Sequence, residues 1–217
     1  LMFNSLDLVT YVSPRDLGEV LGDNNLGVVP YDALSFSFFG MNTTRNVLKD
    51  KRVRQAINMA VDRAAIAATI MRSTVKPTSH GIEPGVFGYN PAIVSYPYEP
   101  AKARALLADA GYAKGLKLKA SVLSAGAPDM ATIYQKVAQD LAAVGITLEL
   151  NSVQGTEWVQ MWASGDWRGA DVLSSSWNGA TYMDAGRAVE AYTCAKPGPF
   201  FCAPEVEKIF AQSNVEF

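Results

Sequence analysis

Helical and strand patterns alternate through the middle of this chain, and this alternation most constrains how the chain can fold. Apolar residues recur at helical spacing in two stretches that each end at a glycine: residues 100–110 before Gly111, and residues 129–144 before Gly145. A strand pattern follows each helix, over residues 116–123 and 146–150. Because helices that alternate with strands pack against the sheet that the strands form, the pattern predicts an α/β fold with parallel or mixed strand pairing.

The stretches on either side of this unit predict further elements. Before it we expect a helix from Pro14 to about Leu21 with Ser13 as its N-cap, strands over residues 26–29 and 33–39, and a helix capped by Asp50 that resumes at Asp62 and runs to Ile70. After it we expect a short helix around residues 158–162, a strand over residues 171–177, and a helix from Pro204 that buries Val206, Ile209 and Phe210. Residues 73–99 are rich in proline and glycine and predict a long loop, which is either functional or packed across a surface.

Composition limits the classes of partner. The 217 residues carry a net charge of −2, which argues against nucleic acid as the main partner because phosphate binding requires an excess of Lys and Arg. No apolar run reaches the roughly 18 residues that a membrane-spanning helix needs. With 49% hydrophobic and 18% charged residues, the chain has the composition of a globular protein with a substantial core.

The sequence offers little support for catalysis. His80 is the single histidine, and neither a Gly-x-Ser-x-Gly elbow nor a phosphate-binding Gly-Lys-Ser/Thr loop occurs. One histidine and two cysteines do not make a metal site without further ligands nearby. We therefore expect a protein that is not an enzyme and has no catalytic residue, metal site or cofactor. A hydrolytic α/β enzyme with paired carboxylates and a ligand-sensing module are the alternatives.

The two cysteines, Cys194 and Cys202, lie close together in a stretch rich in proline and glycine. A disulfide between them would indicate an oxidising compartment, since cytosolic disulfides are rare. Closing so short a loop contributes roughly 2–3 kcal/mol in the loop-entropy account. The alternative is a pair of unrelated buried thiols.

Three stretches together resemble the family 5 extracellular solute-binding proteins, which bind oligopeptides, dipeptides and nickel complexes. They are residues 41–44 (MNTT) followed by residues 50–63 (DKRVRQAINMAVDR), residues 98–112 (YEPAKARALLADAGY) followed by Gly115, and residues 141–146 (LAAVGI). Each motif alone is weak, because Ala/Leu-rich helices that end at a glycine are common. Their order and spacing are specific, and together they cover roughly residues 30–210.

The resemblance implies the fold of periplasmic binding proteins of the large, two-lobe type II class, with a mixed sheet flanked by helices in the lobe seen in this chain. Residues 1–30 would form a crossover or hinge segment that leads from the first lobe. Residues 31–217 would form the second lobe, incomplete at its C-terminal side, so that the chain would be a fragment of a longer protein. Such proteins trap a solute between their lobes by hinge closure.

The same resemblance implies the partners and the location. The solute would be peptide-like or another small polar molecule, and the closed protein would deliver it to the permease subunits of an ABC importer at the membrane. The protein would be a periplasmic monomer, or an extracellular, membrane-anchored protein in a Gram-positive source.

The loop after the strand 171–177 is the predicted ligand site, because ligands of open α/β sheets bind beyond the carboxyl ends of the strands. The predicted ligand-binding residues are Trp177, Asn178, Thr181, Tyr182 and Asp184. The stretch is similar to the Trp-Gly-Ala-Pro-Tyr-Asp-Pro run of nickel-binding members. Peptide-binding members pair an Asp with the ligand's ammonium group near the position of Ala180, so the alanine disfavours a free-amino peptide and leaves the solute unidentified. Alternatively, Trp177 is a core aromatic at a strand end and Asp184 caps a helix.

Other conspicuous side chains have structural interpretations. Trp158 and Trp162 lie one helical turn apart, which is more typical of a core than of a binding platform. Arg52 and Arg54 have acidic neighbours on their helix and are expected in solvated ion pairs. His80 is expected as a surface or loop-packing residue.

Overall fold

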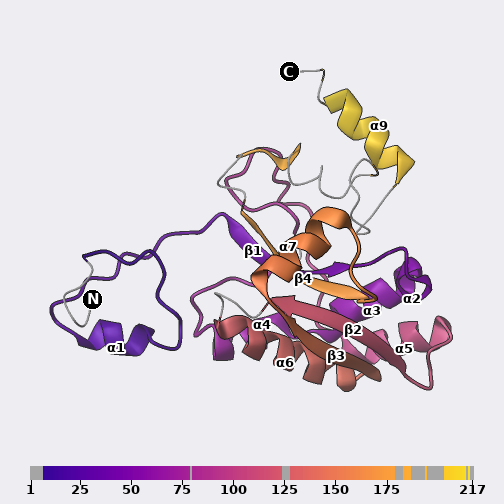
Figure 1. The fold of residues 1–217 in the computed structure, drawn as a ribbon, viewed down its shortest axis with the longest axis horizontal. Coiled ribbons are helices and arrows are strands. Elements are labelled where there is room, and N and C mark those ends of the chain that lie inside the picture. Colours follow the sequence, from indigo (N-terminus) through magenta and orange to yellow (C-terminus); the bar gives the residue numbers. More distant parts are fainter. Residues whose placement is uncertain are drawn as a thin grey trace.

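The computed structural model describes residues 7–78, 80–123, 128–178, 183–186, 194, 203–213 and 215. Four strands form one mixed sheet in the order β1-β4-β2-β3 (Figure 1): β1 (Ser35–Met41), β2 (Leu116–Leu123), β3 (Ile146–Val153) and β4 (Val172–Asn178). β2 pairs in parallel with both β3 and β4, whereas β1 pairs antiparallel with β4 at one edge. The predicted α/β fold with mixed strand pairing is therefore confirmed.

Alternation along β2 decides which face of the sheet the helices cover. Leu118, Ala120 and Val122 are buried, and the alternate positions of the strand include the exposed Lys117 and Lys119. Successive side chains of a strand point to opposite faces, so the apolar set faces one helical layer and the lysines face away from it.

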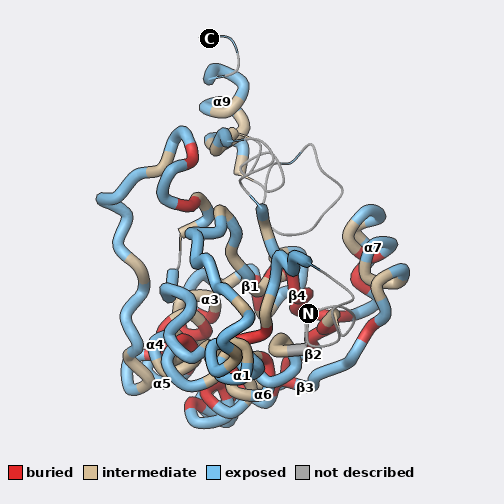
Figure 2. Tube along the Cα trace, turned by 90° about the vertical axis from the view of Figure 1, so that its left-hand side faces the viewer, coloured by how far each residue is buried: buried red, intermediate tan, exposed pale blue. Residues whose placement is uncertain are grey.

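Three helices cover the apolar face: α3 (Lys51–Ala60), α5 (Pro100–Asp109) and α6 (Pro128–Ala142). Their buried residues form one core with β2, β3 and the start of β4. On the other face α7 (Gly155–Ser164) packs with Val153 and Leu173 in a smaller cluster. Figure 2 shows the buried residues concentrated in the sheet and in the helices packed on it.

Several predicted helix boundaries are confirmed by their hydrogen bonds. The carboxylate of Asp50 accepts from the backbone N–H of Arg52 at 2.8 Å, and that of Asp62 accepts from Ala65 at 2.9 Å. Asp62 precedes α4 (Arg63–Ala65), which continues as a π-helix, η1 (Ile66–Ile70); a short helix, α2 (Asn46–Lys49), precedes α3. Gly111, after α5, has a φ of 92°, a left-handed conformation that glycine adopts without strain.

Three sequence-based predictions are wrong. Residues 26–29 form no strand, and Val29 is 86% exposed, because no described strand lies beside them. The first helix, α1, spans Leu17–Gly22 rather than starting at Pro14, and Ser13 is not its N-cap. The helix α9 (Pro204–Ser213) buries none of its residues, and Ile209 is 67% exposed, since no described element covers its apolar face.

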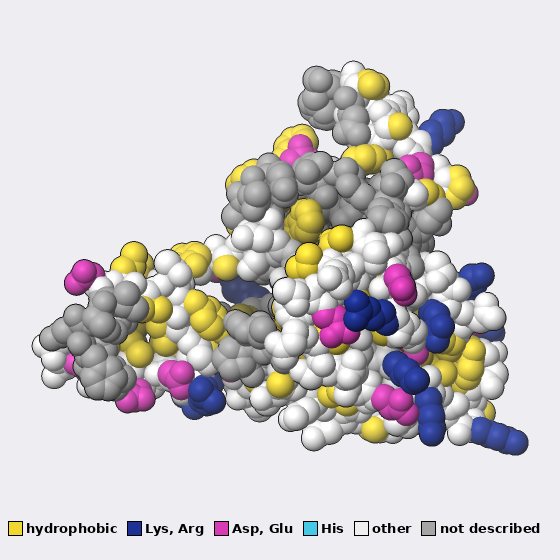
Figure 3. All heavy atoms as spheres, viewed as in Figure 1, with side chains coloured by type: hydrophobic (Ala, Val, Ile, Leu, Met, Phe, Trp, Pro, Cys, Tyr) yellow, Lys and Arg dark blue, Asp and Glu magenta, His cyan; other side chains and the backbone are white. Residues whose placement is uncertain are grey.

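The N-terminal segment, residues 7–34, extends away from the sheet and carries α1 (Figure 1). Many of its apolar side chains lie on the surface (Figure 3): Leu8, Val9, Tyr11, Leu21, Val28, Val29 and Tyr31. Among the residues that the structure describes, no helix combines the length and the hydropathy that crossing a bilayer would require.

Candidate functional site

The candidate site lies at the edge of the sheet where β2, β3 and β4 all end. β4 ends at Trp177 and Asn178, which stand opposite Phe36 and Ser35 at the start of β1. Because β2 runs parallel to both β3 and β4, Leu123 and Val153 end at the same edge. The topology therefore gathers three carboxyl ends, the position at which α/β sheets bind ligands.

Trp177 is half-buried, so part of its ring faces solvent at this edge. Directly opposite residues of an antiparallel pair share a face, which places Trp177 beside Phe36, and the ring of Phe36 lies 5.4 Å from that of Phe38. Asn178, the next residue along the strand, is exposed and carries a polar amide side chain. Together they offer an apolar surface for stacking and a polar group for orientation, the combination typical of small-molecule sites.

Buried hydrogen bonds hold the end of β4 in place. The hydroxyl of Ser174 accepts from the backbone N–H of Leu123 at 2.8 Å, and its carbonyl accepts from the indole N–H of Trp158 at 2.6 Å. The hydroxyl of Tyr134, on α6, donates to the carbonyl of Phe38 on the neighbouring strand β1 at 3.1 Å, and burial raises the pKa of Tyr134 well above its usual value. Trp177 therefore extends from a rigid support, which limits the entropy lost when a ligand binds.

Residues 183–186 follow the loop after β4 and pair with the long loop before α5. The backbone N–H of Phe87 donates to the carbonyl of Met183 at 3.1 Å, and that of Ala185 donates to the carbonyl of Phe87 at 2.9 Å. Gly88 makes this approach possible: its φ is 89°, and a Cβ atom there would lie 2.6 Å from the Cβ of Ala185.

Asp184 is exposed, and its carboxylate accepts a hydrogen bond from the backbone N–H of Gly186 at 2.6 Å. This is the contact that a helix-capping aspartate makes, and it leaves the second carboxylate oxygen for a ligand. Of the other predicted ligand-binding residues, Thr181 and Tyr182 lie outside the described residues, as does Ala180. The structure thus places Trp177 and Asn178 at one edge of the sheet and pairs Asp184 with Phe87 of the long loop.

Sequence reasoning missed the contribution of the long loop. It predicted that residues 73–99 either act in function or pack on a surface, but it did not connect them with Asp184. The available signal was the pair Gly85 and Gly88, which flank Val86 and Phe87 and both have positive φ. Glycines so spaced indicate a tight turn or a close backbone approach, although not its partner.

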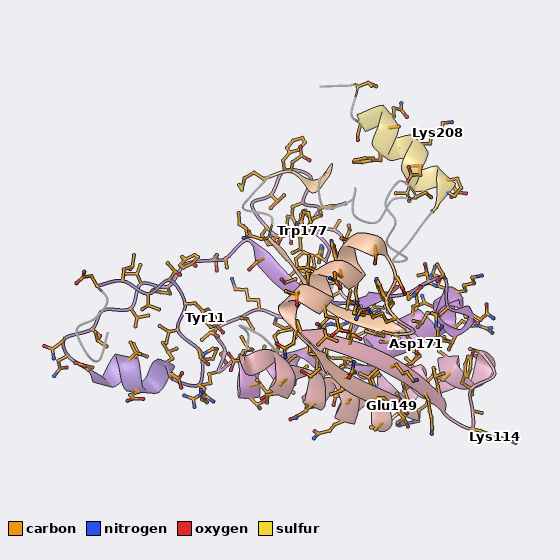
Figure 4. The ribbon with its side chains drawn as sticks, viewed as in Figure 1. Tyr11, Lys114, Glu149, Asp171, Trp177 and Lys208 are labelled. Atoms are coloured by element: carbon orange, nitrogen blue, oxygen red, sulfur yellow. The ribbon has the colours of Figure 1, made fainter. Side chains whose placement is uncertain are left out.

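A hollow of about 660 Å³ lies at the opposite end of the sheet. It is lined by Thr44, Arg45, Asn46, Val47, Tyr112, Leu116, Lys117, Lys119, Glu149 and Asp171. Arg45 donates to Asp171 at 2.8 Å, and Lys119 stands opposite Glu149 in the register of the neighbouring strand. Figure 4 shows Asp171 and Trp177 at opposite ends of β4. We therefore assign this hollow a structural role.

The other side chains that the sequence analysis discussed pack or pair within the protein. Trp158 and Trp162 both lie on α7, stack with their ring centroids 5.5 Å apart, and pack against the smaller cluster on the sheet. Arg52 forms the expected ion pair with Asp50 at 2.6 Å, whereas Arg54 donates to the carbonyls of residues 48 and 49 instead of an acidic partner. The ring of His80 lies 5.5 Å from that of Tyr89.

Two further predictions concern cysteines and metals. Cys194 is disulfide-bonded, but Cys202 lies outside the described residues, so the pairing of these two residues stays a prediction. Within the part of the chain that the structure describes, no group of three His, Cys, Asp or Glu side chains is placed to hold a metal ion.

Comparison with known proteins identifies the family. Residues 2–198 match the family described as bacterial extracellular solute-binding proteins, family 5 Middle. Heme-binding protein A of Haemophilus influenzae is 28% identical over 149 residues, which cover 67% of this chain and 27% of that protein. Di/tripeptide-binding protein 2 of Pseudomonas aeruginosa is 28% identical over 178 residues, which cover 81% of this chain and 33% of that protein.

A similar solved structure is the dipeptide-binding protein from Pseudoalteromonas sp. SM9913 in complex with Met-Leu. It superposes with a TM-score of 0.86 at 19% identity, covering 98% of this chain and 43% of that one. The chain thus spans between about a quarter and a third of the length of the two relatives, 27% and 33%. Because the family match covers nearly the whole sequence, the chain belongs to the family 5 bacterial extracellular solute-binding proteins.

Proposed function

We propose that this chain is part of the solute-binding component of an ABC importer. Residues 31–217 contribute one lobe, and residues 1–30 form the crossover that connects this lobe to the other. The protein traps a solute between the two lobes and delivers it to a membrane permease. A partly exposed Trp177 on a rigid carboxyl edge of the sheet carries the proposal, because such an edge presents a ligand-binding surface without catalytic groups.

The length of the chain relative to its relatives supports the two-lobe arrangement. The described part of the proposed site is one open wall formed by Trp177 and Asn178 on the sheet edge, and Asp184 pairs with Phe87 of the long loop. Small-molecule sites bury most of the surface of their ligand, which a single wall does not achieve. The second wall would come from the other lobe, and affinity would arise when closure desolvates the contacts from both sides.

We propose a peptide-like or other small polar solute as the ligand. One relative is named for heme and another for di- and tripeptides, and the similar structure holds Met-Leu. The ring of Trp177 would stack on an apolar or planar group of the solute, and Asn178 would bond to a polar edge. Ala180 does not supply the carboxylate that would pair with a free ammonium group, so Asp184 is the described acidic residue best placed for a cationic ligand.

The partners and the location follow from this function. The protein would act as a monomer in the periplasm, or outside a Gram-positive cell with a membrane anchor, and the permease would recognise its closed form. A disulfide between Cys194 and Cys202 would be stable in either compartment.

The test is ligand capture by the longer protein that contains this chain. Native mass spectrometry of the purified protein should show a bound solute, and its affinity is then measured by isothermal titration calorimetry. Trp177→Ala should weaken binding at least tenfold, because a stacked aromatic ring supplies both contact area and water exclusion. Tyr112→Ala is the matched control, since Tyr112 lines the hollow at the far end of the sheet.

Each outcome has a defined meaning. Binding that is weakened by Trp177→Ala and kept by Tyr112→Ala, with both variants folded by circular dichroism, supports the proposal. Equal affinity of the wild type and Trp177→Ala would remove the assigned site. Turnover of esters or glycosides by the wild type would instead favour the hydrolytic alternative.

A further inference from the structure

The N-terminal segment, residues 7–34, makes its long-range side-chain hydrogen bonds to one carboxylate of the rest of the chain. Its helix α1 buries no residue, and most residues of the segment are exposed (Figure 2). Ser13 and Pro14 are its buried residues within the described ranges. Every long-range side-chain hydrogen bond described for this segment ends on the carboxylate of Asp129.

Two hydroxyl groups share this carboxylate. The hydroxyl of Tyr11 donates to Oδ2 of Asp129 at 3.0 Å, and that of Ser13 lies 3.2 Å from Oδ1 and 3.1 Å from Oδ2. The Ser13 oxygen also accepts from the backbone N–H of Arg15 at 3.3 Å, which fixes the orientation of the hydroxyl. The hydroxyl thus donates to Asp129 and accepts from Arg15, and α1 begins only at Leu17, after Asp16.

The position of Asp129 connects the contact with the candidate site. Asp129 lies in the first turn of α6, where the helix dipole stabilises a negative charge. α6 is the first helix after β2, whose carboxyl end lies at the ligand edge of the sheet. Figure 4 shows Tyr11 where the N-terminal segment meets the body of the chain.

We propose that Tyr11, Ser13 and Asp129 are positioning residues, which set the direction in which the crossover leaves this lobe and therefore the resting separation of the two lobes. This inference rests on the proposed function. A hinge absorbs its rotation in a few residues at the ends of elements, and the fixed point beside them defines the open angle. Tyr11 is largely exposed, so water competes for the contact, which can then break and re-form during closure.

The contact also affects affinity. If the crossover were free to leave the lobe in many directions, the unliganded protein would populate more arrangements of its lobes. Closing on a solute would then cost more conformational entropy, and the apparent affinity would fall. The carboxylate thus favours binding without touching the solute.

The test compares four versions of the longer protein that contains this chain: the wild type, the double variant Tyr11→Phe with Ser13→Ala, the conservative variant Ser13→Thr, and Tyr31→Phe. Tyr31 is an exposed tyrosine on the same segment, so its variant controls for loss of a hydroxyl elsewhere. A spin label at exposed Lys114, introduced as Lys114→Cys, and a second label in the other lobe report the distance between the lobes by pulsed electron paramagnetic resonance.

The double variant should broaden the distance distribution of the unliganded protein and weaken solute binding roughly three- to tenfold, because water competes for hydrogen bonds at an exposed group and reduces what they contribute. Ser13→Thr keeps a hydroxyl and should behave as the wild type, as should Tyr31→Phe. A role confined to stability would lower the melting temperature without changing the distances.

The inference is overturned if the double variant and the wild type show the same distance distribution while the wild type closes on its solute. In that case the proposed function stands. If the wild type binds no solute and its lobes show no closure, the proposed function and this inference both fail. The two failures are therefore distinguishable within one experiment.

Discussion

Asp171 joins three parts of the fold at the start of β4, and its removal should be costly. Its carboxylate accepts from the backbone N–H of Lys119 at 2.9 Å and from the guanidinium of Arg45 at 2.8 Å. Its backbone carbonyl accepts from Asn42 at 2.9 Å. The residue is only 6% exposed, so its side chain is shielded from water in the folded protein.

The magnitude follows from the two partners of the carboxylate. A hydrogen bond to a charged group contributes roughly 1.5–3 kcal/mol, and truncation leaves the N–H of Lys119 without its acceptor. Arg45 is half exposed, so its ion pair adds only about 0.2–1 kcal/mol. We expect Asp171→Ala to lower the free energy of unfolding by about 2–4 kcal/mol, and Asp171→Asn, which keeps an oxygen acceptor, by about 1–2 kcal/mol.

The assay is equilibrium unfolding in guanidinium chloride, followed by tryptophan fluorescence and circular dichroism with a check that the m-value is unchanged. Arg45→Met is the control and should cost less than about 1 kcal/mol, because it removes the exposed partner and leaves Asp171 bonded to Lys119. If Asp171→Ala lowers the free energy of unfolding no more than Arg45→Met does, the hydrogen bond between Asp171 and Lys119 is not what stabilises the start of β4.

Two further predictions concern the long loop and the N-terminal contact. Gly88→Ala should destabilise the protein by about 1 kcal/mol or more and speed amide exchange at Phe87 and Ala185, because Gly88 has a positive φ and a Cβ there would lie 2.6 Å from Ala185. Gly81→Ala is the control and should leave stability and exchange unchanged, since no atom lies within 4 Å of the added Cβ. The pKa of Tyr11 is raised by burial and by its hydrogen bond to Asp129, so its contribution to stability is present below the ordinary tyrosine pKa near 10 and is lost as pH rises through the raised value. Asp129→Asn should lower the pKa of Tyr11 in a titration of ¹³C-labelled tyrosine, and an unchanged pKa would contradict the contact.

The sequence predicts the sheet and its helical cover well because local patterns decide them. Strand alternation over residues 116–123 matches β2 residue for residue, and the glycine after α5 ends that helix as predicted. The position of Trp177 at a strand end also follows from local pattern together with the rule for α/β sheets. These features depend on neighbours in the sequence, which a single chain displays directly.

The predictions that failed depend on residues far away in the sequence. Ser13 has the features of an N-cap, but Asp129 engages its hydroxyl across the fold. Residues 26–29 have the composition of a strand, but no described strand lies beside them to pair with. Ile209 falls at the spacing expected for the buried face of a helix, but no described element covers it. The contact of Phe87 with residues 183–185 is equally non-local, so no pattern within the loop identifies it.

The residues at the two ends of the sheet differ in how strongly the fold depends on them. At the far end, the carboxylate of Asp171 accepts a hydrogen bond from the backbone N–H of Lys119 on β2, and loss of this bond would lower the free energy of unfolding. At the carboxyl end, Trp177 is half-buried and Asn178 is exposed. Substitution of Asn178 should therefore lower the free energy of unfolding less than substitution of the buried Asp171.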